Sequence, residues 1–523
     1  MLGRPPGTAY VRAVISHEGE DVDASKEFSR LSRTYFCNGT FRDSTATKTY
    51  PVLDPATGLG IGEIAECTTD EIDEVVAAGA QAQRLWWKES ALVRAEKLHE
   101  VAAAMRRQVP EVAELLTREM GKPYKESADE VLWSVTATDY YAEIGRHDMG
   151  HVVGPAVAGQ LHYTVKEPMG VVVIVLPFNY PLVLLCWAGI AALAAGNAIV
   201  VKPSESTSLT TLKFMEVFDA LPAGLVQCVT GGADAGTQLV THTGTHMVAF
   251  TGSVPSGQAV ARACAETFKP SLIECSGNDP FLVMPSAPLR TAARGAAFAA
   301  FLNCGQVCTS AERFYVHTDV YDEFARLVVE EAAKLRVGNG LDKVDVGPMV
   351  SSKERARYER ILARAVEQGA KVAHGGGRPA DLDEGFFLEP TVLVDVTPDM
   401  DVVNGEVFGP MAPLCRVDSF EEALRLANDS PYGLGANIYS TDLIEVSRAT
   451  NELEAGLVWV NAPLLDNDAG PFGGRKLSGT GRQLGAEGLD TFRHTKLVMV
   501  DPYVTDQDFW WFPYSDDEAF HQG

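Results

Sequence analysis

Residues 301–313 read FLNCGQVCTSAER and place Cys308 among small or uncharged side chains. A thiol presented by such a stretch can act as a nucleophile, because cysteine becomes strongly reactive once it is partly ionised. A single cysteine in an apolar context is, however, more often a buried structural residue. The choice between these interpretations depends on what other chemistry the chain can bring to the thiol.

Two further polar residues could serve a reactive thiol. Glu274 ends the apolar run LIE, where a carboxylate is either a solvated strand end or a general base with a pKa set by apolar surroundings. Asn179 lies between two prolines in LPFNYP, where it is either an ordinary turn residue or a rigid amide donor for an oxyanion. Each residue alone leaves both interpretations open.

Taken in order along the chain, these three stretches resemble the aldehyde dehydrogenase superfamily. The resemblance runs from about residue 35 to about residue 500, and four shorter motifs support it in the family's order: KPSE (202–205), FTGS (250–253), EVFGP (406–410) and PFGG (471–474). No single motif is decisive, but seven in the right order are hard to attribute to chance.

The resemblance implies NAD(P)-dependent, non-acylating oxidation of an aldehyde to a carboxylic acid. Cys308 would form a thiohemiacetal and then a thioester, with the oxyanion held by its own backbone N–H and by the Asn179 amide. Glu274 would activate the water that releases the acid. The resemblance also implies a set of cofactor-binding residues and no metal: Pro177, Phe178, Lys202, Glu205, Gly252, Ser253, Glu406 and Phe408.

Lys202 and Glu205 stand three residues apart at the end of an expected strand, where charged residues are ordinarily just solvated. By resemblance they bind the adenosine ribose, and a carboxylate there repels a 2′-phosphate, so NAD is favoured over NADP without excluding it. The loop FTGSVPSG follows a strand and opens a helix, so its Ser253 and the helix N-terminus can meet a diphosphate. Glu406 would hold the nicotinamide ribose, with Phe408 beside it.

Other functions stay open at this point: a relative that passes the thioester to coenzyme A, a thioesterase or esterase, and a structural relative without catalysis. The first generally lacks a base at the Glu274 position, and the second would not need a dinucleotide-binding half. The presence of Cys308, Glu274 and Asn179 together argues against the third.

Two departures from the family pattern are visible. Where relatives commonly have Glu-Leu-Gly-Gly, this chain has Glu-Cys-Ser-Gly at residues 274–277, and we assign no catalytic role to Cys275 or Cys304. The segment NAPLLDNDAG (461–470), which lines the substrate entrance in the family, carries Asp466 and Asp468. These acids indicate either a polar or cationic aldehyde or, more commonly, a solvated loop.

The 523-residue chain has 70 acidic and 44 basic residues and a formal net charge of −26. This excess argues against nucleic acid and anionic membranes as partners, since both are bound through clustered Lys and Arg. The nine cysteines are odd in number and match neither a disulfide framework nor a zinc motif, which favours reduced thiols in the cytoplasm. The uncharged stretch 168–201 is long enough to span a bilayer, but prolines near its start predict a buried strand, helix and strand instead.

Alternating strands and helices predict an α/β protein with two doubly wound domains and a small β domain for oligomerisation. Residues 1–149 and 169–276 would form the NAD-binding domain, and residues 277–480 the catalytic domain. Early helices over 69–87, 91–108, 110–120 and 131–144 are expected to pack on one side of the first sheet.

The strands within 150–168 and 489–502 are expected to pair. Their open edges would be covered by other subunits, which predicts a homodimer or homotetramer. Residues 503–523 form a tail too rich in aromatic residues to stay solvated, so we expect it to dock.

Overall fold

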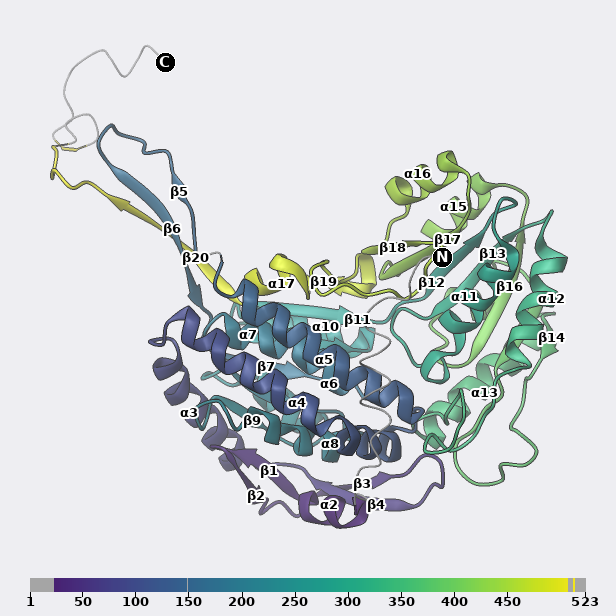
Figure 1. The fold of residues 1–523 in the computed structure, drawn as a ribbon, viewed down its shortest axis with the longest axis horizontal. Helices are drawn as coiled ribbons and strands as arrows, with labels where there is room; N and C mark the ends of the chain where they lie inside the picture. The colour runs from purple at the N-terminus through teal and green to yellow at the C-terminus, as the bar shows by residue number, and fades with distance from the viewer. Residues whose placement is uncertain (1–22, 148, 507–510, 513–523) are drawn as a thin grey trace.

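The computed structural model describes residues 23–147, 149–506 and 511–512. In this part of the chain the strands form sheets of eight, seven and three strands and one two-stranded ribbon, β3 (Thr49–Leu53) with β4 (Gly60–Ala65). Figure 1 shows the eight-stranded part at the lower left, the seven-stranded part at the right, and the three-stranded part as an arm. The α/β class predicted from the sequence is confirmed.

The eight-stranded sheet has five parallel central strands, β11, β10, β7, β8 and β9. Its full order is β19 (Gly479–Thr480), β11 (Ser271–Cys275), β10 (Met247–Gly252), β7 (Val171–Val175), β8 (Ala198–Lys202), β9 (Val226–Cys228), β1 (Thr34–Cys37) and β2 (Thr40–Asp43). Strand β19 pairs with β11, so the chain re-enters this sheet just before residue 480. The predicted boundary of the catalytic domain at residue 480 includes these two residues, since a two-residue strand leaves no periodic signal in a sequence, and the domain division stays a prediction.

The seven-stranded sheet is parallel except for its edge strand β14. Its order is β14 (Lys371–His374), β15 (Thr391–Val396), β16 (Met411–Val417), β13 (Ala311–His317), β12 (Asp279–Val283), β17 (Gly435–Tyr439) and β18 (Leu457–Val460). The assignment of cofactor binding to the first sheet and catalysis to the second stays a prediction.

The early helices do not all cover one face of the first sheet, so that prediction is wrong. Val75 and Val76 of α3 (Thr69–Trp86) pack with Val171 and Val173 of β7. Helices α4 (Ala91–Met120) and α5 (Tyr124–Ile144) pack in the core that holds the other residues of β7, Val172 and Ile174. Alternate residues of a strand point to opposite faces, so α3 and the α4–α5 pair lie on opposite sides.

Two expected helix boundaries also differ. Helix α4 runs unbroken through Pro110, although proline removes a helical hydrogen bond. The buried side chains of Val109 and Val112 on either side keep the helix packed against the core. Helix α5 begins at Tyr124, seven residues before the expected start at Val131.

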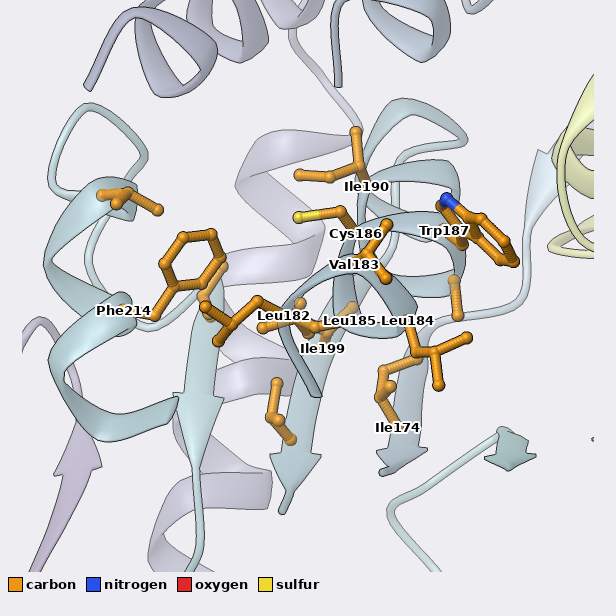
Figure 2. Close-up of a cluster of buried hydrophobic side chains, with 14 of the residues drawn as sticks. Ile174, Leu182, Val183, Leu184, Leu185, Cys186, Trp187, Ile190, Ile199 and Phe214 are labelled. Carbon is orange, nitrogen blue, oxygen red and sulfur yellow. The ribbon is translucent and has the colours of Figure 1, made fainter. Parts of the chain in front are cut away.

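The expected helix over 182–195 is a composite of α6 (Pro181–Leu185), a π-helical turn (Cys186–Ile190) and α7 (Ala191–Ala194). Figure 2 shows Leu182 and Leu185 beside Ile199 and Phe214, while Trp187 extends from the other side of the segment. Single π turns inside helices often occur at functional sites, and Trp187 lies in this one as a buried member of the same hydrophobic cluster.

The remaining described α-helices surround the two large sheets (Figure 1). They are α2 (Ala24–Leu31), α8 (Ser208–Phe214), α9 (Ala233–Thr241), α10 (Val254–Ala265), α11 (Leu289–Phe301), α12 (Tyr321–Ala332), α13 (Ser352–Glu367), α14 (Asp401–Asn404), α15 (Phe420–Asn428), α16 (Leu443–Glu452) and α17 (Gly485–Asp490). Within the described residues, no helix combines the length and apolarity needed to cross a membrane.

The arm at the upper left of Figure 1 consists of β20 (Arg493–Val500), β6 (Leu161–Pro168) and β5 (Val152–Val153). Strands β20 and β6 pair along their whole length, from Arg493 opposite Pro168 to Val500 opposite Leu161, which confirms the predicted pairing. Of the tail, residues 503–506 and 511–512 are described, and Tyr503, Val504, Trp511 and Phe512 among them are exposed. The predicted docking of the tail otherwise falls on residues 507–510 and 513–523, outside the described residues.

Candidate active site

Cys308 lies in the turn between α11 and β13. It is half-buried, whereas the other cysteines of the chain are buried, and none forms a disulfide. The preceding residues Asn303 and Cys304 adopt left-handed backbone angles, with φ of 50° and 56°, a strain that persists only where the surroundings hold it. Gly277 approaches so closely that a Cβ there would lie 2.2 Å from the Cys308 carbonyl oxygen, so a side chain at this position would displace the turn.

Glu274 ends β11 and is 2 % exposed. Its Oε2 accepts a hydrogen bond of 2.7 Å from Gln483 Nε2, while Oε1 has no hydrogen-bond partner in the described structure. Burial, reinforced by the charge of Asp466, raises the pKa of Glu274 to about 8, while its contacts with Cys308 and Gln483 act in the opposite direction. A carboxyl group with this pKa changes protonation close to neutral pH, as a general base must.

The thiol of Cys308 is itself hard to ionise. Burial and the neighbouring Glu274 carboxylate raise the pKa of Cys308 well above its usual value. The thiol is therefore protonated at neutral pH and needs a base in direct contact to become a nucleophile. Glu274 is the neighbouring carboxyl group that could serve as this base, and no motif in the sequence indicates that the two side chains are neighbours.

Asn179 is buried at the start of α6, where its Nδ2 donates to Gln306 O at 3.1 Å. Its backbone oxygen accepts a 2.6 Å hydrogen bond from Lys122 Nζ. Lys122 forms a fully buried ion pair with Glu130, whose Oε1 in turn accepts the N–H groups of residues 182 and 183 in α6. An amide has two N–H hydrogens, so one remains for a ligand while the residue is held rigidly.

Sequence reasoning missed this support for Asn179. In the sequence, Lys122 lies in EMGKP, where the glycine and proline indicate only the end of a helix. The pairing of Lys122 with Glu130, eight residues on, had no functional signal, and Gln483 lies 209 residues from Glu274 in sequence.

Cys308 and Asn179 share a pocket with a volume of about 490 Å³, including the space open to solvent. Most of its wall is apolar and aromatic: Trp133, Tyr180, Val183, Leu184, Trp187, Leu302, Val307, Leu464 and Phe472. Trp187 packs on Phe472 with ring centroids 4.9 Å apart, and Trp133 stacks on Tyr180 at 6.3 Å. Glu274 does not line this pocket and meets the site through its interaction with Cys308.

Asp466 is the one charged side chain among the described residues of the pocket wall. It lies in the loop between β18 and β19, exposed to solvent. Although the residue as a whole is exposed, its carboxyl group faces the pocket and is partly desolvated there. This desolvation, followed by the charge of Asp468, raises the pKa of Asp466 to about 7, so its carboxylate is ionised above that pH. The pocket is therefore electrostatically negative at one side.

A second groove, of about 1440 Å³ including open space, lies along the carboxyl ends of β7, β8 and β10. It brings together six of the eight predicted cofactor residues: Pro177, Phe178, Lys202, Glu205, Gly252 and Ser253. Helix α10 starts here with Ser253 as its N-cap, so the N–H groups of its first turn open into the groove. A helix N-terminus, a lysine and a carboxylate along one groove fit a dinucleotide.

Glu406 and Phe408 do not line this groove. The Phe408 ring instead meets the Phe178 ring edge-on, with centroids 5.9 Å apart, so their loop borders the groove through Phe178. Burial, followed by the neighbouring Glu312, raises the pKa of Glu406. No group of three or more His, Cys, Asp or Glu side chains that could hold a metal occurs among the described residues.

The family model described as "Aldehyde dehydrogenase family" matches residues 41–498. The chain belongs to the aldehyde dehydrogenase family. As an aldehyde dehydrogenase it is an oxidoreductase, and its family uses NAD or NADP.

Several relatives match this aldehyde dehydrogenase over most of both chains. A peroxisomal aminoaldehyde dehydrogenase 2 of Pisum sativum is 35 % identical, covering 92 % of this chain and 98 % of the relative. The structure of betaine aldehyde dehydrogenase from Staphylococcus aureus with NAD⁺ has a TM-score of 0.90 at 30 % identity, and the match covers 93 % of this chain and 98 % of that chain. A 3,6-anhydro-L-galactose dehydrogenase in complex with NADP has a TM-score of 0.87 at 38 % identity, covering 90 % and 100 %.

Proposed function

We propose that this aldehyde dehydrogenase oxidises an aldehyde to a carboxylic acid with NAD, through covalent intermediates on Cys308. The observation that carries the proposal is a half-buried thiol and a rigid amide that line one pocket, with a buried neighbouring carboxyl group that keeps one oxygen without a hydrogen-bond partner. Coenzyme A acylation needs no such base, and ester hydrolysis needs no cofactor groove. A silent structural role needs neither feature.

In the proposed reaction Glu274 takes the proton of the Cys308 thiol, and the sulfur attacks the carbonyl carbon to form a thiohemiacetal. The free N–H of Asn179 and the backbone N–H of Cys308 stabilise the oxyanion, each by about 3–4 kcal/mol of transition-state energy. NAD, when bound, supplies the hydride acceptor that converts the thiohemiacetal to a thioester.

Release of the product uses the same base after Glu274 has given the thiol's proton to solvent. Glu274 then takes a proton from water, and the hydroxide attacks the thioester carbon. The C–S bond breaks to free the acid, and the leaving thiolate takes the proton back from Glu274 to restore the thiol. The overall reaction converts one aldehyde, one water and one NAD⁺ to one carboxylic acid, one NADH and one free proton. Gln483 holds the Glu274 carboxyl in place through Oε2 and leaves Oε1 for these transfers.

The groove supports NAD as the preferred cofactor. Lys202 and Glu205 would hold the adenosine ribose, and the first turn of α10 the diphosphate. The carboxylate of Glu205 would repel a 2′-phosphate, so replacing Glu205 with Gln is expected to narrow the preference for NAD over NADP. A higher kcat/KM with NADP than with NAD in the wild-type enzyme would contradict this assignment.

The pocket wall supports an aldehyde that carries a positive charge. Asp466 provides a carboxylate, Trp133, Tyr180 and Trp187 provide aromatic rings that attract cations, and no basic side chain of the described residues opposes them. The names of the aminoaldehyde and betaine aldehyde relatives agree with a cationic substrate. The sulfur of Cys308 and the Asp466 carboxylate would then contact opposite ends of the substrate.

This charge preference is tested with betaine aldehyde and its neutral isostere 3,3-dimethylbutanal. We expect Asp466→Asn to lower kcat/KM about fivefold for the cation and to leave the isostere within about twofold, since a partly exposed charge pair contributes roughly 1 kcal/mol. Asp468→Asn, two residues away and outside the pocket wall, is the matched control. Equal losses for both aldehydes would remove charge selection from the proposal.

The arm supports a homodimer or homotetramer. Its outer strands β20 and β5 have unpaired edges within the described structure, and it exposes apolar side chains at Val152, Leu161, Leu497 and Met499. Monomers seldom leave such strands and side chains uncovered. Light scattering is expected to give a multiple of the 56.3 kDa chain mass, and a single-chain mass would contradict this assembly.

A reducing, cytoplasmic location remains part of the proposal, in keeping with nine free thiols.

The decisive test follows NADH absorbance with a panel of aldehydes, with and without coenzyme A. We expect NADH and free acid without coenzyme A from the wild type, and none from Cys308→Ala, which should still bind NAD. A strict requirement for coenzyme A would identify an acylating enzyme, and ester cleavage without any NADH would identify a hydrolase. Steady aldehyde turnover by Cys308→Ala would remove the thiol from the mechanism.

A further inference from the structure

Glu312 is a buried carboxylate that holds a backbone loop rather than a charged partner. It lies on β13, four residues after Cys308, and is 2 % exposed. Its two oxygens accept the N–H groups of Val407 at 2.9 Å and Phe408 at 2.7 Å. Asn278 Nδ2 adds a third hydrogen bond to Glu312 Oε2, at 3.1 Å.

The loop that joins α14 to β16 comprises residues 405–410 and lies in no strand or helix of its own, and Glu312 holds its first part, residues 405–408. Phe408 adopts a left-handed backbone angle, with φ of 46°, which a phenylalanine keeps only when its neighbours impose it. Arg357 of α13 holds the loop from the other side, donating to the carbonyl oxygens of Glu406 at 3.1 Å and Val407 at 2.6 Å. Glu312 thus accepts from the loop's N–H groups while Arg357 donates to its carbonyl groups.

The loop lies between the two functional regions. A Cβ on Gly305, three residues before Cys308, would lie 2.2 Å from the carbonyl oxygen of Gly409, so the cysteine turn packs directly on the loop. On its other side, Phe408 meets Phe178 of the cofactor groove. Because Glu312 and Cys308 flank the start of one strand, Glu312 fixes the loop relative to the nucleophile.

We propose that Glu312 is a positioning residue for hydride transfer, holding the 405–408 loop so that Glu406 and Phe408 orient the nicotinamide end of the cofactor against the Cys308 adduct. This inference rests on the proposed function, which assigns those two residues to the cofactor. Glu312 touches neither substrate nor cofactor in this role. Its carboxylate is required because glutamine has a single acceptor oxygen and would place an NH₂ group against a backbone N–H.

The test compares Glu312→Gln with Glu422→Gln. The control makes the same change in a glutamate that also accepts a backbone N–H, that of Asp418 at 2.7 Å, but on an exposed helix start. For each variant kcat, the KM for NAD and the primary isotope effect with aldehyde deuterated at C1 are measured. The thiol is assayed separately by its alkylation with iodoacetamide in the absence of NAD.

For Glu312→Gln we expect a kcat about 10- to 100-fold lower, a KM for NAD about tenfold higher, and a larger isotope effect, because misplacement by about 1 Å slows the transfer itself. Alkylation of Cys308 should stay within about twofold of wild type, and Glu422→Gln should match wild type throughout. A purely structural role would lower the amount of active enzyme without changing the isotope effect or the KM for NAD.

If folded Glu312→Gln has the same isotope effect and the same KM for NAD as the wild type, the inference is overturned while the proposed function stays intact. Absence of NADH formation in the wild type would instead reject the proposed function. If Glu312→Gln does not fold, Arg357→Met loosens the same loop from its outer side and must raise the isotope effect, and an unchanged value there also overturns the inference.

Discussion

The floor and the mouth of the substrate pocket are built in different ways. The floor is defined here by Asn179 of the pocket wall together with Glu274, which neighbours Cys308 without lining the pocket. Asn179 is held by Lys122 and Gln306, and Glu274 by Gln483, all through buried hydrogen bonds between distant parts of the chain. At the mouth, Asp466 sits exposed in a loop and has no hydrogen bond or ion pair to another described side chain. Buried hydrogen bonds therefore fix the geometry where bonds change, whereas the mouth is free to vary and to select substrates.

The largest expected effect comes from removing the base at the floor. Glu274→Gln is expected to lower steady-state turnover about 10³-fold, because water attack on the thioester loses its proton acceptor. An initial burst of about one NADH per active site should remain where the thiol can still be deprotonated by solvent at high pH. Rapid mixing with absorbance detection measures the burst.

Unchanged steady turnover in Glu274→Gln would remove Glu274 from the mechanism. A matched control is Glu66→Gln, which changes another largely buried glutamate that accepts backbone N–H groups, those of residues 232 and 235, away from Cys308. We expect that variant to bind NAD less well through the nearby groove while its burst and steady rates keep their ratio.

The second effect tests how firmly the floor is held. Lys122→Met leaves Glu130 buried without its cation and is expected to lower the free energy of unfolding by about 3–5 kcal/mol. Lys125→Met, three residues along, breaks the solvent-exposed pair with Asp129 and should cost at most about 1 kcal/mol. Urea unfolding followed by fluorescence compares the two, and equal losses would mean that the floor is no more tightly held than the surface.

The sequence could predict the reacting residues and most of the groove, because each lies in a short motif that marks a strand end or a turn. The resemblance made that selection, since Cys308, Glu274 and Asn179 each allowed an ordinary structural interpretation. Partners such as Gln483 for Glu274 could not be predicted, because they depend on how β11 and the chain after β19 come together. The side of the sheet that α3 covers likewise depends on packing that periodicity does not report.

Trp133 separates the substrate pocket from a neighbouring cavity near the mouth. It lines the substrate pocket and also an adjacent outer cavity of about 1130 Å³ including open space, with Tyr180 and Leu302 as the other shared walls. Trp133→Ala is expected to join the two spaces and raise kcat/KM for a bulky aldehyde about tenfold relative to a short one, the scale of a few buried methylene groups. The rate of Cys308 alkylation should stay the same, and an unchanged ranking of aldehydes would show that Trp133 is not the partition.

The smallest expected effect is a change in the pH dependence of Glu274 caused by the charge of Asp466. With a pKa of about 8 for Glu274, kcat/KM for a neutral aldehyde should rise between pH 7 and 9, because the base acts only when it is deprotonated. Asp466 is ionised in this range, with a pKa of about 7, and its negative charge disfavours ionisation of Glu274.

Asp466→Asn should therefore move the rising limb of the pH profile to lower pH, by roughly half a unit for a charge that solvent screens. A neutral aldehyde keeps direct attraction to the substrate out of the measurement. Added salt should shrink the difference between the two enzymes, since it screens the exposed carboxylate but not buried Glu274. A limb that stays in place after Asp466→Asn would show that mouth and floor are electrostatically independent, and the pKa of Glu274 would then be set by burial alone.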